Sequence, residues 1–410
     1  MLIFLEFFHL LGHAILDRWT RVNLDAYAFP DIASAALAER PPASHVDPLD
    51  VVRWVHDAPL LPPQADVTTD FGQPPITVFH CEHFYIDVLF WVDGTTAIHQ
   101  HRFSGAFHVM DGSSVQSTYQ FTPTRRFSER LSLGHLALSR VELLRRGDTR
   151  PIVAGAGLIH ALFHLDRPSV SVVVRTPTDA FAGPQYTYTR AGIAHDPFAK
   201  DETTTRKLQS LDLLHKLAHP DFEKLVRESL ERADALLAFR LLAHLAKRLE
   251  TPERFSAFLT GFSLRHDGLL EAMHAYAEEE HRDHYIIARR RLAKQPEHRF
   301  FLALLLNHVR REPILELVRQ AHPDQEPVMT ILRWLSELAR LDAIHAWVAD
   351  ASKAAVATKD VSILDVTLDA ESLSSARDLL DGRTSLPAVG PASPAVEALR
   401  KSILLRPLFS

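Results

Sequence analysis

Two histidines separated by one residue, His99 and His101, are the feature of this sequence that most directly suggests chemistry. Residues two apart on a β-strand point to the same face, so both imidazoles can reach one point inside a β-structure. Imidazole nitrogen is a ligand for iron, zinc, copper and nickel. Because the chain holds 24 histidines among 410 residues, such pairs also arise by chance, and a site needs a third ligand from elsewhere.

The third candidate ligand is His160, which follows a stretch containing Gly155 and Gly157. Glycines at these positions permit a tight turn that delivers the histidine onto a further strand. We therefore expect His99, His101 and His160 to bind one divalent metal ion. His164 lies farther from the turn, so we interpret it as a hydrogen-bonding or substrate-contacting residue and favour His160 over it as the ligand.

The elements around these histidines are short. Residues 75–180 consist of runs rich in Val, Ile, Phe, Tyr and Thr that are separated by glycine and aspartate turns. This spacing is typical of an antiparallel sandwich or barrel. It predicts strands at residues 76–79, 85–92, 105–110, 115–121 and 170–175.

On both sides of this region the residue pattern changes from short β-type runs to helical spacing. We therefore predict an α+β protein. After this region, leucine recurs every three or four residues, and Thr251-Pro252-Glu253 has an N-cap threonine followed by a proline at the first helical position. We expect an N-terminal helical and irregular cap (1–74), a β-barrel (75–200), a separate all-helical domain (201–380) and a linker with a C-terminal tail (381–410).

The two histidine blocks, in this order, resemble the two motifs of the cupin superfamily over residues 75–180, roughly a quarter of the chain. The resemblance implies an antiparallel cupin-type barrel (jelly roll) around the metal. In most cupins a glutamate follows the second histidine by four or five residues, but Gly105 and Ala106 occupy those places here. The thiol dioxygenases, of the cysteine dioxygenase type, likewise lack this carboxylate and use three histidines, and they are the most similar group.

This resemblance implies iron(II), with zinc, nickel or manganese as other metals that such a site accepts. Three neutral ligands leave the ion its full double charge, which favours a small anionic or chelating substrate bound at the metal beside O2. The sequence then departs from the thiol dioxygenases. Residues 76–80 lack the family's substrate-binding arginine, and its Ser-x-His-x-Tyr pattern reads Ser171, Val173 and Arg175 here. Free cysteine is therefore not the expected substrate.

Arg175 shares a strand face with Ser171 and Val173 by alternation, which makes it a candidate to replace the missing arginine as an anion clamp. The alternative interpretation is a charged residue at the rim of the barrel. A charged stretch at residues 278–284 contains one ExxH pattern, but a di-iron bundle needs two. We interpret this stretch as the solvated end of a helix.

Composition excludes several other classes of function. The 45 basic and 51 acidic residues are interleaved, so no basic face is available for nucleic acid. The single cysteine, Cys81, rules out an intrachain disulfide, which fits a reducing cytoplasm. Glu6, His9 and His13 interrupt the apolar start of the chain, so we expect a packing helix there and no membrane span.

Together these features predict an iron(II)-dependent oxygenase or dioxygenase. Two alternatives remain open from the sequence. One is a non-redox metal-dependent cupin acting as isomerase, lyase or hydrolase. The other is a non-enzymatic cupin scaffold whose helical domain binds another protein. The helical domain could equally cover the barrel mouth or form a homodimer surface.

Overall fold

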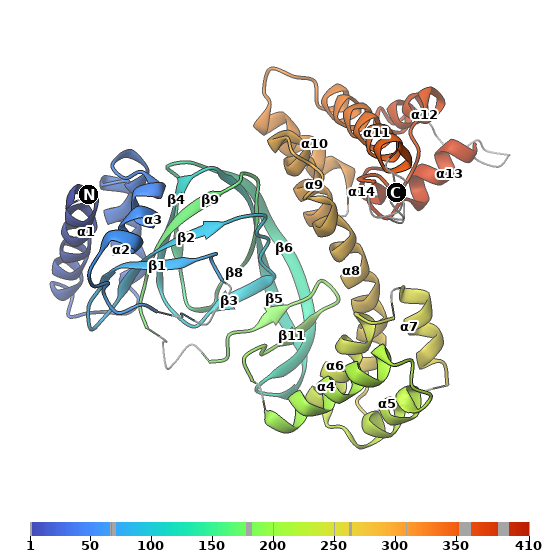
Figure 1. Ribbon diagram of the computed structural model, residues 1–410, viewed down its shortest axis with the longest axis horizontal. Helices are drawn as coiled ribbons and strands as arrows, with labels where there is room; N and C mark the ends of the chain where they lie inside the picture. The colour runs from blue at the N-terminus through green and yellow to red at the C-terminus, as the bar shows by residue number, and fades with distance from the viewer. Residues whose placement is uncertain are drawn as a thin grey trace. The chain divides into compact units, whose positions relative to one another are not determined.

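The computed structural model divides into two compact units, Met1–Arg140 with Leu144–His281, and Val141–Leu143 with Arg282–Ser410 (Figure 1). It describes residues 2–65, 67, 71–177, 183–199, 201–249, 251–261, 265–308, 310–351, 362–383 and 393–409. Residues 352–361 and 384–392, which belong to the predicted helical domain and linker, lie outside the described residues. The four-part division made from the sequence stays a prediction.

The first unit contains a five-stranded antiparallel sheet. Its strand order is β1 (Pro75–His80), β2 (Tyr85–Trp91), β9 (Ser169–Arg175), β4 (Gly105–Asp111) and β7 (Thr149–Ile152). Both faces of its central strands are buried, which explains why β2 and β9 read as nearly continuous apolar runs. Even-numbered residues such as Val88 and Val172 pack against the N-terminal helices, and odd-numbered ones such as Leu89 and Val173 face the second sheet.

The N-terminal helices cover the outer face of this sheet (Figure 1). They are α1 (Leu2–Thr20), α2 (Phe29–Glu39) and α3 (Pro48–Asp57), joined by the short turn η1 (Pro42–Ser44). Phe8, Leu11 and Ile15 of α1 are fully buried in the core that they share with β1, β2 and β9. The apolar start of the chain is thus a packing helix, as the spacing predicts. No described helix is long and apolar enough to cross a membrane.

The second sheet has six strands and closes on itself, because β10 pairs with both β11 and β3. Apolar residues of β6 and β8 meet those of β2, β4 and β9 in one core between the two sheets. The strands lie in the order β10 (Thr187–Tyr188), β11 (Ile193–His195), β6 (Leu131–Arg145), β5 (Ser113–Ser128), β8 (Gly155–His164) and β3 (Ile98–His101). The expected α+β class with antiparallel sheets is therefore confirmed.

Helices follow from residue 202 on. In the first unit these are α4 (Glu202–Lys216), α5 (Asp221–Arg232), α6 (Ala235–Ala246), α7 (Pro252–Leu259) and the start of α8 (Leu269–Arg289). Thr251 accepts a hydrogen bond from the backbone N–H of Arg254, which confirms the predicted start of α7. These helices share a core with Leu131 and Ile193 of the six-stranded sheet.

The charged stretch 278–284 is not a helix end, which corrects the interpretation made from the sequence. It lies inside α8, and Glu279 is only 16% exposed. The Glu279 carboxylate accepts hydrogen bonds from the backbone N–H groups of Arg190 and Ala191, at 2.7 Å each. It therefore holds the turn between β10 and β11, a tertiary contact that the local sequence does not encode.

In its described residues, the second unit consists of helices and their connections, apart from residues 141–143 of β6. It contains the end of α8, then α9 (Pro296–Asn307), α10 (Arg311–Ala321), α11 (Pro327–Ala351), α12 (Ala370–Leu380), α13 (Pro394–Lys401) and α14 (Arg406–Phe409). Its core surrounds the fully buried Trp334, whose indole N–H donates to Glu297 at 2.8 Å. The described residues between 282 and 380 have the helical character predicted for residues 201–380, whereas α13 and α14 lie in the part predicted as linker and tail.

Candidate metal centre

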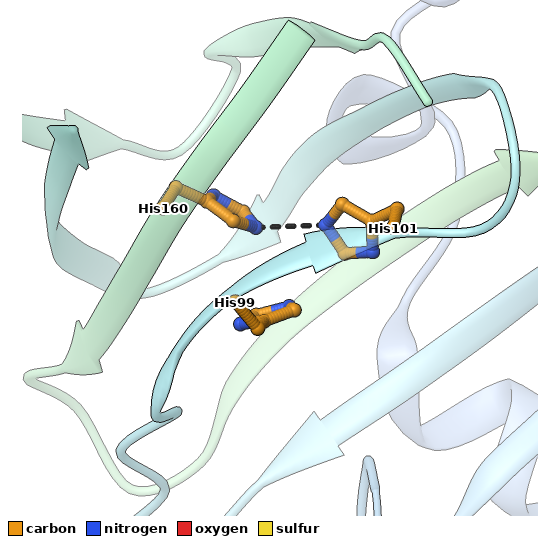
Figure 2. Close-up of side chains that lie close together, drawn as sticks. All are labelled: His99, His101 and His160. Carbon is orange, nitrogen blue, oxygen red and sulfur yellow. Dashed lines mark hydrogen bonds between the residues drawn. The ribbon is translucent and has the colours of Figure 1, made fainter. Parts of the chain in front are cut away.

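Two neighbouring strands bring the three predicted histidines together (Figure 2). His99 of β3 lies directly opposite His160 of β8 in the antiparallel register, and such pairs place side chains within contact. A register shift follows His99, so His101 pairs with Gly155 at the start of β8. The ring centroid of His99 lies 4.6 Å from the ring centroid of His101 and 4.9 Å from that of His160.

The nitrogens of these rings converge on one point. Nε2 of His101 lies 2.9 Å from Nε2 of His160, and one ligand atom from each of the three histidines lies within 4.8 Å of the others. Two imidazole nitrogens at about 2.1 Å from one metal ion and at a right angle to each other are about 3.0 Å apart. The spacing therefore suits adjacent ligands of a single ion.

His99 supplies the clearest sign that the cluster fits a metal. Its Nδ1 lies 2.8 Å from the backbone carbonyl of Ala97, which fixes the proton on Nδ1. Its Nε2 is buried and has no hydrogen-bond partner. The lone pair on this buried Nε2 lacks a hydrogen-bond donor, and a metal ion shared with His101 and His160 would satisfy it.

Burial keeps all three imidazoles neutral. It lowers the pKa of His99, and it lowers the pKa of His101 and His160 well below the usual value. The neighbouring histidines reinforce the effect on His101 and His160, and the Arg175 guanidinium adds to it at His101. Since a metal binds the neutral ring, these shifts favour binding at neutral pH.

The fold also explains why no glutamate joins the cluster. A Cβ built on Gly105 would lie 1.9 Å from the backbone carbonyl oxygen of Val174 on the neighbouring strand β9. Ala106 is fully buried on the opposite face of β4, against the N-terminal helices. Neither position can present a carboxylate to the histidines. Among the described residues the candidate metal site consists of three histidines.

The cluster opens into a cavity of about 620 Å³, a volume typical of small-molecule sites. His99, His101 and His160 lie on its wall together with Arg175, Ser171 and Val173. Most of the remaining wall is apolar or aromatic, with Phe71, Leu89, Trp91, Phe103, Phe107, Ile152, Leu162 and Phe198.

Arg175 is held firmly at this cavity. Its Nε lies 3.3 Å from Oδ2 of the buried Asp87, whose Oδ1 accepts a hydrogen bond from Thr77 at 2.7 Å. Its guanidinium lies over the rings of Tyr85 and Phe103, 4.8 and 5.0 Å from their centroids. The side chain is 12% exposed, so Arg175 lies inside the cavity wall and not at an open rim.

His164, the other residue singled out from the sequence, is not part of this cluster. Its ring stacks on Trp91 at 4.5 Å, and its Nδ1 lies 2.8 Å from Oγ of Ser114. Trp91 itself donates its indole N–H to Ser171 Oγ at 3.0 Å, and both of these residues line the cavity. His164 therefore supports a cavity wall from behind.

Two further residues that support the site, Gln116 and Asp87, were not predicted from the sequence. The Gln116 side-chain nitrogen lies 3.4 Å from Nδ1 of His160, while its amide oxygen is buried without a partner. Turning this amide by 180° places the oxygen against Nδ1, where it accepts the Nδ1 proton and leaves Nε2 free for a metal. Finding either residue requires the strand register, which no local motif carries.

The similarities to known proteins are confined to distant likenesses of structure. No protein-family model and no curated protein matches this sequence. Similar solved structures include hydroquinone 1,2-dioxygenase from Sphingomonas sp. TTNP3, at 12% identity and a TM-score of 0.21 over 25% of this chain and 65% of that one. A cupin-2 domain protein from Shewanella frigidimarina matches at 12% identity and a TM-score of 0.18, over 27% of this chain and 85% of that one. A structure of DMSP lyases matches at 16% identity and a TM-score of 0.22, over 40% of this chain and 80% of that one. Likenesses at this level leave the activity to be argued from the site.

Proposed function

We propose that this protein is a mononuclear non-haem iron(II)-dependent oxygenase or dioxygenase built on a cupin-type jelly roll. His99, His101 and His160 would hold the ion, and the substrates would be O2 and a small anionic or chelating molecule. The observation that carries the proposal is the convergence of three buried imidazole nitrogens on the wall of a 620 Å³ cavity.

Each part of the site has a role in this proposal. The iron supplies the redox chemistry with oxygen. The three neutral histidines hold it without cancelling its charge, so an anionic donor from the substrate is favoured. The guanidinium of Arg175 binds and orients the substrate's anionic group. The apolar walls exclude water, which strengthens both electrostatic interactions.

The test starts from metal content. Protein purified without oxygen should contain about one iron per chain, while His99→Ala and His160→Ala should lose most of it. His164→Ala, a buried histidine on the same strand as His160 but outside the cluster, should retain its metal. Equal metal content in all four proteins would end the assignment of the site.

A non-redox enzyme is the second candidate, because the same ligand set also suits it. Three histidines with an open side also form catalytic zinc sites that activate water. Oxygen uptake separates the two candidates. An oxygenase consumes O2 in proportion to the substrate turned over and requires iron, whereas a non-redox enzyme works equally well without O2 and with zinc.

A further inference from the structure

The chemistry of the cavity wall narrows the class of substrate. Arg175 presents a cation whose position is fixed by Asp87 and by the rings of Tyr85 and Phe103. A guanidinium held in this way loses little freedom on binding a planar carboxylate. The cavity thus has a rigidly held receptor for a carboxylate group on the wall that also carries the histidine cluster. The second arginine that lines it, Arg102, is exposed.

Among the described residues that line the cavity, no carboxylate is available to a substrate ammonium group. Asp87 is the one acidic residue among the described residues that line it. Both of its oxygens are engaged, Oδ1 with the hydroxyl of Thr77 and Oδ2 with Arg175. An amino acid would therefore bring its ammonium group into an apolar cavity without a partner, which is costly.

The hydroxyl and amide groups of the wall already hold hydrogen bonds within the protein. Thr96 accepts from the backbone N–H of Leu162, Thr176 bonds both backbone groups of Ser104, and Gln185 accepts from the backbone N–H of Arg102. Ser171 already accepts a hydrogen bond from Trp91, and the surfaces beside it are formed by Leu89, Phe107 and Val173. A sugar acid would lose hydrogen bonds to water here and regain few of them.

Aromatic rings make up much of the remaining wall, six of the lining residues being aromatic. Phe71 meets Trp91 edge to face at 5.0 Å and an interplanar angle of 90°, so ring edges and faces border the cavity from one side. Phe71 and Phe198 stay 40% and 64% exposed, which leaves aromatic surface that a ligand can cover. Edge-to-face and stacked contacts favour a flat ring over a saturated one of the same size.

We infer that this cavity takes an aromatic carboxylic acid, and neither an amino acid nor a sugar acid. The inference rests on the proposed function in treating the cavity beside the three histidines as the substrate site. It goes beyond it in assigning the carboxylate to Arg175 and the ring to the aromatic wall.

Three matched probes test the inference by calorimetric titration of the full chain, once metal-free and once loaded with iron under anaerobic conditions. They are 3-phenylpropanoate, 3-cyclohexylpropanoate and L-phenylalanine. The phenyl acid should bind about 3- to 10-fold more tightly than the cyclohexyl acid, the gain expected for aromatic contacts. It should bind at least about tenfold more tightly than L-phenylalanine, which differs from it by the ammonium group.

The double variant Asp87→Asn with Arg175→Gln removes the cation without leaving a buried carboxylate unpaired. It should weaken binding of 3-phenylpropanoate at least about tenfold, as expected for losing a charged hydrogen-bonding partner. Arg126→Gln, which removes the same charge from an exposed position on β5, should stay within about twofold of the parent. If the double variant does not fold, Arg175→Lys replaces it and should weaken binding at least about threefold, because the planar fork is lost.

Several results would overturn the inference: no binding of 3-phenylpropanoate, equal or tighter binding of the cyclohexyl acid or of L-phenylalanine, or an unchanged affinity without Arg175. The metal-free titration separates this failure from that of the proposed function. If the three probes bind in the expected order of affinity but the chain binds no iron, the oxygenase proposal is wrong and the inference about the substrate class stands. If the chain binds iron but the probes bind in a different order of affinity, the inference about the substrate class is wrong and the proposed metal site stands.

Discussion

At the scale of single residues, Gln116 is the side chain that sets the state of His160. Replacing it by leucine removes the acceptor that holds the proton on Nδ1, so Nε2 is no longer fixed as the ligand atom. We expect Gln116→Leu to weaken metal binding by about tenfold or more in competition with a chelator. Gln116→Glu, which keeps an acceptor at the same place, should recover most of the loss. Parental affinity in the leucine variant would show that the amide has no such role.

His108 gives a prediction for the dependence of stability on pH. It is fully buried, its Nε2 accepts from the backbone N–H of Ala43, and its Nδ1 contacts Thr149 at 2.8 Å. Burial lowers the pKa of His108 from 6.5 to about 4. Between pH 6.5 and 4, His108 is protonated in the unfolded chain but stays neutral in the folded chain. The free energy of unfolding should therefore fall, by up to about 3 kcal/mol from this group, as the pH drops from 6.5 to 4.

Urea denaturation at a series of pH values measures this effect. His108→Gln should lose part of the acid-induced destabilisation, while the same change at the exposed His135 should leave it as in the parent. A His108→Gln protein with the full parental dependence on pH would contradict the account.

Residue types and spacing carried much of the information about the site. The two-residue period of a strand places His99 with His101, and it places Arg175 on the face of Ser171 and Val173, as the structure has them. The partners that hold these groups, Asp87 and Gln116, could not be predicted. They come from β2 and β5, and their proximity depends on pairings between strands that are distant in sequence.

At the scale of elements, the tight pairing of β4 with β9 excludes side chains at Gly105. This glycine lies opposite Arg175 in the register, and an added Cβ meets the backbone of β9. We expect Gly105→Ala to lower the free energy of unfolding by about 1–3 kcal/mol, because the strands must separate to admit the methyl group. It should also weaken binding at Arg175, whose backbone shifts with β9. Chemical denaturation measures the first effect, and a variant as stable as the parent would contradict the packing described.

Most elements follow from hydrophobic periodicity, but closure of the six-stranded sheet does not. It depends on the two-residue strand β10, which is too short to give a periodic signal. The prediction for residues 278–284 was wrong for a related reason. Their charges suggested solvent exposure, whereas the Glu279 carboxylate accepts hydrogen bonds from the turn after β10. In both cases a tertiary contact decides the structure and the local pattern does not.

At the scale of the whole molecule, the candidate site belongs entirely to the first of the two compact units. A ligand that binds only the folded state stabilises the unit that contains its site, by about 4 kcal/mol at a thousandfold excess over Kd. We expect calorimetry to resolve more than one unfolding transition and metal to raise the temperature of one of them. In the His99→Ala variant, adding metal should shift none of these transitions. A single transition that shifts as a whole would show that the units unfold together.

The central claim is that three imidazoles, without a carboxylate, hold one metal ion. X-ray absorption of the iron-loaded protein tests it most directly, because imidazole rings give a characteristic multiple-scattering pattern whose amplitude reports their number. We expect three imidazole ligands in the parent and in His164→Ala, and two in His99→Ala or His160→Ala if these retain iron. A spectrum unchanged by His99→Ala, or one that requires a protein carboxylate at the iron, would contradict it.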